Sequence, residues 1–478
     1  MEKFSRYFFR RAIIPLLLCI ACGQTTASYN IEIPQNDGSP GSGPQIITSK
    51  EIDIKGKAAS YSGLNESKVS LSEGASLFLT GGVNEVLSSS VIILKDCYSW
   101  VFFPAVSRDQ WHLAQLGKYI RIGHQPFAEG SNAELVNYYN GVYVRAKYDS
   151  FLIPAVLYRK EDSSGISLNR IYSGADIPVG NDALTGFMLR RGFMMTLAEN
   201  HDGTGASKVY MATETDLKVD LDDELASKVS FLRVVPWNYV CKRGCGGNFS
   251  MKEAVGATWF YSWSIKFEST NSMDYTPMFW GGVSSTAVDA VLAKHMTNHV
   301  LAFNEPDGKD QSDLTPQKAL ELYPAILKTG LRVGSPACRE GAWRTWLDEF
   351  MNGCREHNYR VDFIAIHWYD WGNWSSTKDP SPANVDAIVN RFKKDIDNCY
   401  AKYGLPIWIT EFNANKNRLT PIQVEFLMKA IPMLESHPHV ERYAYFQPNG
   451  GNGDFIIDGQ LTQTAKAYHC IPSTPAVK

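Results

Sequence analysis

The sequence predicts an all-β, sandwich-like domain at residues 46–250, followed by a compact (β/α)₈ barrel at residues 255–478. In the first segment, short apolar and β-branched runs with period-two alternation are separated by turns rich in Gly, Asn, Asp and Ser, which is typical of antiparallel β structure. In the second, buried strands alternate with amphipathic helical stretches, a pattern that indicates a parallel sheet covered by helices. A chain of 478 residues with 44% hydrophobic and 20% charged residues is long enough for these units.

The first 45 residues predict export rather than a folded unit. A basic start is followed by the apolar stretch "IIPLLLCIA" and Cys22, and this stretch is too short to cross a bilayer. Small residues before Cys22 are similar to a bacterial lipoprotein cleavage box, although Cys19 stands where that box prefers Leu. Residues 23–45, rich in Pro, Gly and Ser, are predicted to be a linker. We therefore expect residues 1–22 to be a signal segment, with a lipid anchor on Cys22 at the cell envelope or outer surface of a bacterium; ordinary secretion is the alternative.

Charge and cysteine spacing exclude some classes of partner. The net charge is −3 and no long basic run is present, which argues against nucleic acid. Export permits disulfides, and Cys241 and Cys245 are close enough in sequence to close a small loop. No second Cys/His pair follows them at the spacing of zinc ligands, so no metal site is predicted.

The β-rich segment shows no readable catalytic chemistry, because it contains no recognisable nucleophile, metal set or phosphate-binding loop. Two interpretations stay open for it: a structural accessory domain, or a carbohydrate-binding domain. The second depends on four aromatic residues that are equally suited to a core, namely Trp100, Trp111, Tyr138 and Tyr139.

The predicted barrel has about 220 residues, near the lower end for this fold. Seven apolar strands are expected, at residues 257–263, 274–281, 299–305, 331–337, 361–369, 406–412 and 441–446. The clearest helices are expected at residues 315–330, 343–357 and 385–404. Only residues 283–298 separate the second strand from the third, so one unit of the eight is expected to be short.

Polar and aromatic residues follow the ends of these strands, where the catalytic residues of such barrels gather. Glu305 and Glu411 end two separate strands, each embedded in apolar sequence. Two carboxyl groups facing one rim are the apparatus of glycoside hydrolysis, one as acid/base and one as nucleophile or base. Aromatic residues suit the flat C–H faces of sugar rings, and the rim candidates are Trp263, Trp280, His367, Tyr369 and Trp371. Each residue also has a purely structural interpretation: a turn or strand end for Glu305 and Glu411, a core histidine for His367, and barrel packing for the tryptophans.

Five segments in this order, "LAFNEPD", "RVGSPA", "VDFIAIHWYD", "IWITEF" and "VERYAYF", resemble glycoside hydrolase family 128, a clan A family of endo-β-1,3-glucanases. The resemblance covers about residues 255–470. It implies that Glu305 is the general acid/base and Glu411 the nucleophile of a retaining double displacement. It also implies that Asn304 binds the 2-hydroxyl of the sugar, and that His367 and Tyr369 orient the nucleophile or the sugar. No cofactor is implied.

We therefore expect a retaining hydrolase of β-1,3-glucan. The carboxyl groups of a retaining enzyme lie about 5–5.5 Å apart. Glu305 is expected to be the less solvated carboxyl with the higher pKa, since an acid must hold its proton near neutral pH. The alternatives are a clan A hydrolase acting on another β-linked glycan, and an inactive glycan-binding surface protein.

Overall fold

The computed structural model describes most of the chain from residue 45 onward. The described residues are 45–83, 87–149, 152–160, 162–169, 172–174, 177–247, 250–373, 384–448 and 452–477. The predicted signal segment, Cys22 and nearly all of the predicted linker lie outside them. Among the described residues, no helix is long and apolar enough to cross a membrane.

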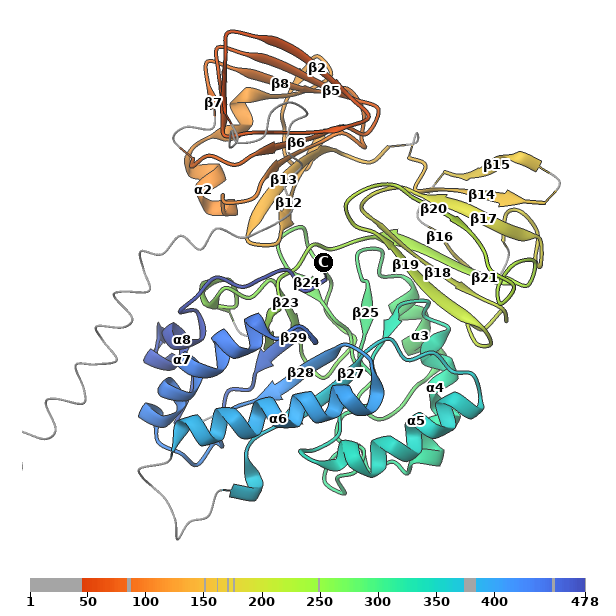
Figure 1. Cartoon of the computed structure of the whole chain (residues 1–478), viewed down its shortest axis with the longest axis vertical. Helices are drawn as coiled ribbons and strands as arrows, with labels where there is room; N and C mark the ends of the chain where they lie inside the picture. Colours follow the sequence, from red (N-terminus) through yellow and green to blue (C-terminus); the bar gives the residue numbers. More distant parts are fainter. Residues whose placement is uncertain are drawn as a thin grey trace, which may run out of the picture.

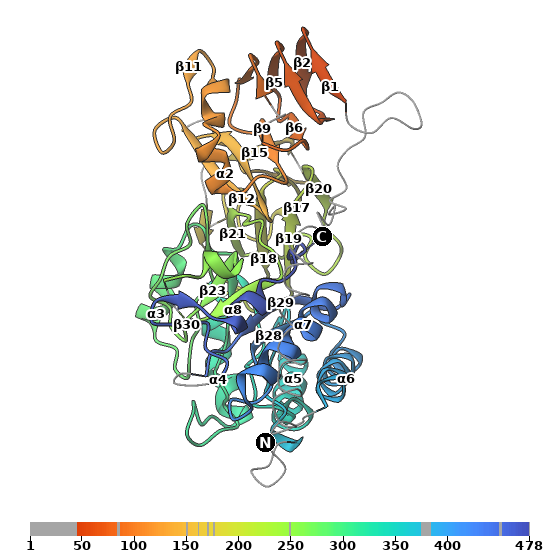
Figure 2. The same ribbon diagram turned by 90° about the vertical axis from the view of Figure 1, so that its left-hand side faces the viewer.

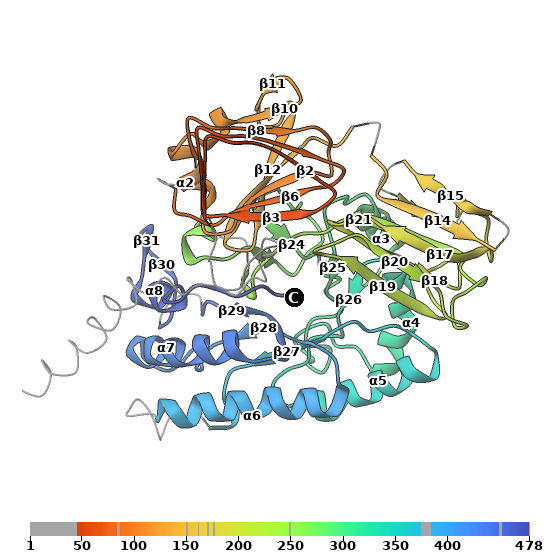
Figure 3. The same ribbon diagram turned by 45° about the horizontal axis from the view of Figure 1, so that its top comes forward.

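The first unit is a three-sided coil of parallel strands, whose triangular outline is clear in Figure 3. Each turn of the coil adds one strand to each of three sheets, so that β1 pairs with β4, β2 with β5 and β3 with β6, all in parallel. The strands of this unit are β1 (Ile46–Thr48), β2 (Glu51–Lys55), β3 (Ala58–Tyr61), β4 (Gly63–Asn65), β5 (Lys68–Ser72), β6 (Ser76–Leu79), β7 (Leu87–Ser88), β8 (Val91–Leu94), β9 (Trp100–Phe103), β10 (Ile120–Ile122), β11 (Gln125–Pro126), β12 (Ala133–Tyr138) and β13 (Gly141–Ala146). A short helix, α2 (Arg108–Leu113), and the 3₁₀ turn η1 (Leu116–Tyr119) interrupt them.

The prediction of one antiparallel, sandwich-like domain is wrong for this part of the chain. Only β10–β11, β9–β13 and β13–β12 pair in antiparallel fashion. Alternation of period two shows that a run is a strand with two different faces, but not how strands pair. The sequence pattern was therefore compatible with both arrangements.

The second unit consists of two four-stranded antiparallel sheets. Their strands are β14 (Ala155–Arg159), β15 (Asp162–Leu168), β17 (Leu184–Leu189) and β20 (Leu217–Asp220) in one sheet, and β16 (Tyr172–Gly174), β18 (Phe193–Ala198), β19 (Ser207–Ala212) and β21 (Phe231–Pro236) in the other. Leu157 and Phe187 from the first sheet share one buried cluster with Leu197 and Leu232 from the second. The two sheets therefore pack over a common core.

The coil is apolar on both faces of the sheet that contains β9. Val101 and Phe103 point into the coil, whereas Trp100 and Phe102, on the opposite face, belong to a cluster shared with the rest of the protein. Tyr239, just after the second unit, lies against these outer aromatics, with its ring centroid 6.5 Å from that of Trp100. In Figure 2 the first unit lies above the second and the C-terminal unit below both.

This packing removes the observation behind a carbohydrate-binding N-terminal domain. The four aromatics proposed for it, Trp100, Trp111, Tyr138 and Tyr139, are all buried. Trp111 lies in the core of the coil, and the other three belong to the shared cluster. They are core residues, as the alternative interpretation held.

The C-terminal unit contains eight parallel strand segments whose pairings close into a ring. The labelled strands are β22 (Arg243–Gly246), β23 (Trp259–Tyr261), β24 (Asp274–Tyr275), β25 (His299–Val300), β26 (Arg332–Val333), β27 (Ile364–Trp368), β28 (Ile407–Phe412) and β29 (Val440–Tyr445). Six of them form one sheet, in which β22 joins β23 to β29. The parallel bridges Met278–Leu301, Gly334–Phe363 and Cys338–Ile366, together with the β25–β26 pair, connect its two edges.

Helices cover the outside of this ring (Figure 1). They are α3 (Ser285–Leu292), α4 (Pro316–Leu327), α5 (Trp346–Glu356), α6 (Val385–Tyr403), α7 (Thr420–Ser436) and α8 (Gln463–Tyr468), with the short 3₁₀ turns η2 (Glu253–Val255), η3 (Ala342–Arg344) and η4 (Trp371–Asn373) and the hairpin β30 (Ile456–Ile457) and β31 (Gln460–Leu461). The sequence explains the main boundaries. Thr315 caps α4 ahead of Pro316, and Asn384 begins α6, which ends at Gly404 with φ +67°.

Two units of the ring are reduced rather than one. Between β22 and β23 the described residues form only the 3₁₀ turn η2, and between β23 and β24 they form a loop. The sequence predicted seven strands, and the eighth, which it did not predict, is β22 within "CKRGCGG". The expected start of this unit at residue 255 is therefore too late. Cys241 and Cys245, considered for a small disulfide loop, are both buried and not joined to each other.

Deleting residues 45–235 is expected to unfold the remainder, because the cluster around Trp237 and Tyr239 would be exposed to water. Arg233, whose guanidinium donates 2.9 Å to the carbonyl of Lys294, would also be lost. We expect the truncated protein to bind a hydrophobic dye and to show no cooperative thermal transition by circular dichroism. A soluble monomer that melts cooperatively near the temperature of the full chain would contradict this.

Candidate active site

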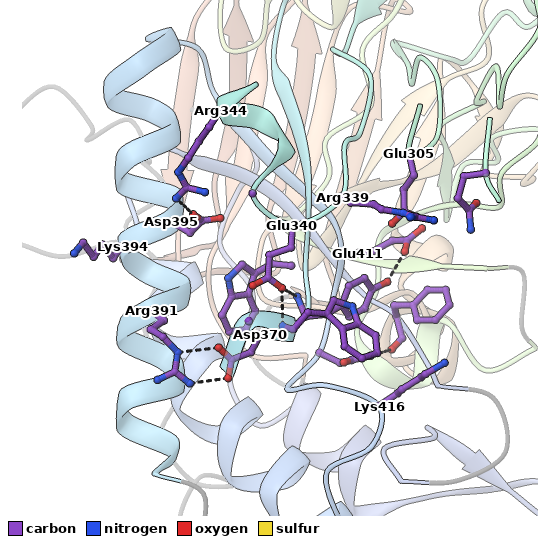
Figure 4. A pocket seen from close by; sticks show the side chains of 18 of the residues that line it. Glu305, Arg339, Glu340, Arg344, Asp370, Arg391, Lys394, Asp395, Glu411 and Lys416 are labelled. Carbon is purple, nitrogen blue, oxygen red and sulfur yellow. Dashed lines mark hydrogen bonds and ion pairs between the residues drawn. The ribbon is translucent and has the colours of Figure 1, made fainter. Parts of the chain in front are cut away.

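Glu305 and Glu411 come together at the carboxyl ends of the ring strands. Glu411 lies in β28, and Glu305 follows the segment that continues β25. One carboxylate oxygen of each residue and the Nδ1 atom of His367 all lie within 4.8 Å of one another. Two residues separated by more than one hundred positions in the sequence thus form one carboxylate pair, as the strand-end pattern predicted (Figure 4).

Three hydrogen-bond donors surround the carboxylate of Glu411. Trp263 Nε1 donates to Oε1 at 2.8 Å, and the Tyr261 hydroxyl donates to the same oxygen at 3.1 Å. The Tyr369 hydroxyl donates to Oε2. Glu411 is 6% exposed, so these donors replace most of the water that would otherwise solvate it. The three hydrogen bonds hold the carboxylate in one orientation.

Glu305 has two cationic partners. His367 Nδ1 lies 2.8 Å from Oε1, and Arg339 Nε donates to Oε2 at 3.1 Å. Burial raises the pKa of Glu305, but the hydrogen bonds and charges of His367 and Arg339 together outweigh it and leave the pKa below its ordinary value. This shift is opposite in direction to the one expected for an acid. Glu305 was also expected to be the less solvated carboxyl, which is wrong, because 13% of its side chain is exposed against 7% for Glu411. The sequence did not place Arg339 beside it.

His367 bridges the two carboxylates. Its Nδ1 atom is 3.5 Å from Glu411 Oε2 as well as 2.8 Å from Glu305 Oε1. Burial lowers the pKa of His367, but the charge of Glu411 and the hydrogen bond to Glu305 raise it above its ordinary value. The three side chains have ligand atoms close enough to hold a metal ion. The Nδ1 atom of His367 contacts both carboxylates without one.

Three residues at the strand ends have left-handed backbone conformations that side chains other than glycine seldom adopt. Their φ angles are +51° for Trp263, +41° for Glu305 and +56° for Asp370. Such strain persists only where surrounding contacts hold it, and it is enriched at functional sites. The turn at Glu305 is held by its own N–H, which donates 2.7 Å to the carbonyl of Ala337.

The other predicted site residues are one buried asparagine and two exposed tryptophans. Asn304 is buried beside Glu305, with its Nδ2 3.2 Å from Gln311 Oε1, whereas its Oδ1 has no hydrogen-bond partner. Trp280 and Trp371 are 41% and 44% exposed. Of the two, only Trp371 is among the residues that line the cleft described next. Trp374, considered with Trp371, lies outside the described residues.

A cleft of about 900 Å³ begins at the carboxylate pair and runs past Trp371 to helix α6. Its walls include Tyr369, which bonds to Glu411, and Phe446, whose ring centroid is 5.9 Å from that of Tyr369. Arg391 and Lys394 of α6 lie at the far end (Figure 4). The cleft combines aromatic surface with many charged and amide groups. Such a lining can pack against sugar rings and bond their hydroxyls.

The sequence interpretation missed three residues of this site: Tyr261, Arg339 and Glu340. Period two offered a signal for Tyr261, because it lies two residues before Trp263 and so shares its side of the strand. Arg339 and Glu340 lie in a loop after β26, where no pattern distinguishes them from surface charges.

The family model described as "Glycosyl hydrolase catalytic core" matches residues 241–468. This part of the chain is thus a glycoside hydrolase catalytic core, the class that the paired carboxylates predicted. The match also includes β22, in agreement with the ring seen in the structure.

Three similar proteins illustrate the relationship. The alkali-sensitive linkage protein 1 of Schizosaccharomyces pombe is 30% identical over 265 residues, which cover 51% of this chain and 45% of the yeast protein. The chain thus spans less than half the length of that relative. A family 128 subgroup I endo-β-1,3-glucanase from Amycolatopsis mediterranei, solved with laminaritriose, is 29% identical; the match covers 48% of this chain and 98% of that one, with a TM-score of 0.42.

A family 128 subgroup III curdlan-specific exo-β-1,3-glucanase from Blastomyces gilchristii, solved with glucose, is 30% identical. It covers 48% of this chain and 98% of its own, with a TM-score of 0.38. The family model confirms the prediction of a glycoside hydrolase for this part of the chain.

Proposed function

We propose that the protein hydrolyses β-1,3-glucan with retention of anomeric configuration, using Glu411 as nucleophile and Glu305 as general acid/base. The observation that carries this proposal is the carboxylate pair, whose oxygens approach within 4.8 Å. Retaining enzymes have closely spaced carboxyl groups, whereas inverting enzymes leave room for a water molecule and separate them by about 6.5–9.5 Å.

In the first step, an Oε atom of Glu411 forms a bond to the anomeric carbon while the glycosidic C–O bond breaks. Glu305 gives its proton to the departing oxygen, and a glycosyl ester of Glu411 results. Hydrogen bonds from Tyr261, Trp263 and Tyr369 fix the orientation of the Glu411 carboxylate before attack. Asn304 is suited to bind a sugar hydroxyl, because its buried Oδ1 has no partner in the protein.

In the second step, Glu305 takes a proton from water, which attacks the anomeric carbon and releases Glu411. Between the steps Glu305 changes from acid to base, so it must gain and lose one proton in each cycle. His367, in contact with both carboxylates, is placed to stabilise whichever of them is ionised.

The pKa of Glu305 gives a testable pH dependence. Only protonated Glu305 can act as the acid, and its protonated fraction falls as the pH rises through its pKa. Because Arg339 helps to lower this pKa, Arg339→Met should raise it and extend activity to higher pH. We expect the alkaline limb of the pH profile of kcat/KM for glucan to move upward.

Arg355→Met is the matched control, since it removes the same charge from an exposed position on α5. Its alkaline limb should coincide with that of the wild type. An Arg339→Met limb that coincides with the control, or lies at lower pH, would contradict the assignment of Glu305 as the acid.

Product analysis tests the substrate. Purified protein should release oligosaccharides from linear β-1,3-glucan, and sizing of the products on linear and branched glucans distinguishes internal cleavage from release at chain ends. Release from another β-linked glycan instead would support the alternative clan A activity. Binding of glucan without hydrolysis by the intact protein would support an inactive glycan-binding role.

The remaining proposals concern architecture and location. The closed ring of eight parallel segments and its outer helices support a (β/α)₈ barrel with two reduced units. We retain export with lipidation at Cys22 as a proposal from the N-terminal sequence. Labelling of cells with a radioactive fatty acid, and its loss in Cys22→Ala, tests it.

A further inference from the structure

Glu340 is partly buried in the loop that follows β26, on the wall of the cleft. Its Oε2 atom accepts hydrogen bonds from the backbone N–H of Tyr369 at 2.8 Å and of Trp371 at 3.1 Å. One carboxylate oxygen therefore holds two alternate residues of a different loop, the one that leaves β27 (Figure 4).

Asp370, between these two residues, is anchored from the other side. It is fully buried, and its carboxylate pairs with Arg391 of α6 at 2.6 Å and with Arg418 at 2.8 Å. Its φ of +56° turns the chain sharply at this point. The backbone of residues 369–371 is thus fixed by Glu340, and the side chain in its middle by two arginines.

The side chains on either side of Asp370 face the cleft. The Tyr369 hydroxyl donates to Glu411, and Trp371 lines the cleft with 44% of its surface exposed. One of them contacts the nucleophile and the other offers a ring surface to the glycan. Their relative position depends on the short segment that Glu340 holds.

We propose that Glu340 is a positioning residue that places both the Tyr369 hydroxyl on the nucleophile and the Trp371 ring in the glycan cleft. The inference rests on the proposed function, and it deepens it by connecting nucleophile orientation to binding through one carboxylate. If Glu340 is removed, two backbone N–H groups lose their acceptor, and the ion pairs of Asp370 alone do not fix the backbone on either side of the strained turn. A displacement of about 1 Å at a catalytic contact is enough to cost up to about 100-fold in rate.

The test compares Glu340→Ala, Glu340→Asp and Glu340→Gln in the full chain, with Glu356→Ala, at an exposed position on α5, as control. We expect Glu340→Ala to lower kcat/KM for soluble β-1,3-glucan by about 10- to 100-fold, with both a lower kcat and a higher KM. Glu340→Gln should stay within about threefold of the wild type, because one amide oxygen can accept both N–H groups as Oε2 does. The side chain in Glu340→Asp is too short to reach them, so this variant should behave like Glu340→Ala and carries the test if Glu340→Ala fails to fold.

Double variants separate positioning from general destabilisation. In a Tyr369→Phe background the phenol contact is already absent, so Glu340→Ala should lower kcat by less than about threefold further. In a Trp371→Ala background, Glu340→Ala should still lower kcat but no longer raise KM. Three results would overturn the inference. The first is that Glu340→Ala lowers kcat and raises KM by the same factors in both backgrounds as in the wild type. The others are that Glu340→Gln is as impaired as Glu340→Ala, or that Glu340→Ala and Glu340→Asp have unchanged kinetics. Failure of the proposed function is distinguishable, because the wild-type protein itself would then release no sugar from β-1,3-glucan.

Discussion

Glu411→Gln is expected to lower turnover of β-1,3-glucan on the order of 10⁴-fold or more while leaving the fold intact. An amide has the shape of the carboxylate but cannot attack the anomeric carbon. The fold should persist because the amide oxygen can still accept from Tyr261 and Trp263, and the Tyr369 hydroxyl can accept from the amide nitrogen.

The measurement is initial rate together with circular dichroism and calorimetric binding of a β-1,3-linked oligosaccharide. Glu425→Gln, at an exposed position on α7, makes the same chemical change away from the cleft and should have wild-type activity. A folded Glu411→Gln protein that retains near-normal turnover would remove Glu411 as the nucleophile.

Glu305→Ala is expected to cripple cleavage of glucan but to spare the first step on an activated aryl glycoside. A sugar hydroxyl leaves poorly without a proton, whereas an activated phenol needs little assistance. The second step would lack its base, so the glycosyl ester on Glu411 should accumulate and be detectable as a mass increase of the intact protein. Azide, a nucleophile that needs no base, should restore turnover and give a β-azide product.

The stereochemistry of that product is decisive. An α-azide would mean inversion at the anomeric carbon and would exclude a covalent ester on Glu411. Equal loss on glucan and aryl glycoside, with no rescue by azide, would show that Glu305 is not the acid/base. His367→Ala is not a substitute for this experiment, because His367 contacts both carboxylates.

The sequence predicted the parts of the site that repeat a local rule. Glu305 and Glu411 each end an apolar strand, and in a parallel ring such ends meet at one rim. Helices α4, α5 and α6 were recognisable from their apolar periodicity. Helix α6 also has a capping residue, Asn384, at its start and Gly404 at its end. The ordered motifs also indicated a glycoside hydrolase, which the family model confirmed.

Other features depended on contacts between distant segments. Strand β22 is only four residues long and includes two glycines, so it has no readable pattern by itself. It is a strand because β23 and β29 pair with it on both sides. The N-terminal coil was mistaken for antiparallel structure, since period two records the faces of a strand and not the direction of its neighbour.

By itself, the sequence determined which residue types stand at the strand ends, and so the class of chemistry. Only the tertiary structure decided how that chemistry is tuned. It placed Arg339 and His367 against Glu305, which lowers the pKa that the acid role led us to expect to be raised. It also placed the Glu340 carboxylate where it accepts hydrogen bonds from the backbone N–H groups of Tyr369 and Trp371. The physical reason is range: strand and helix periodicity arises from contacts within a few residues, whereas the pKa and orientation of a buried group depend on charges brought close only by folding.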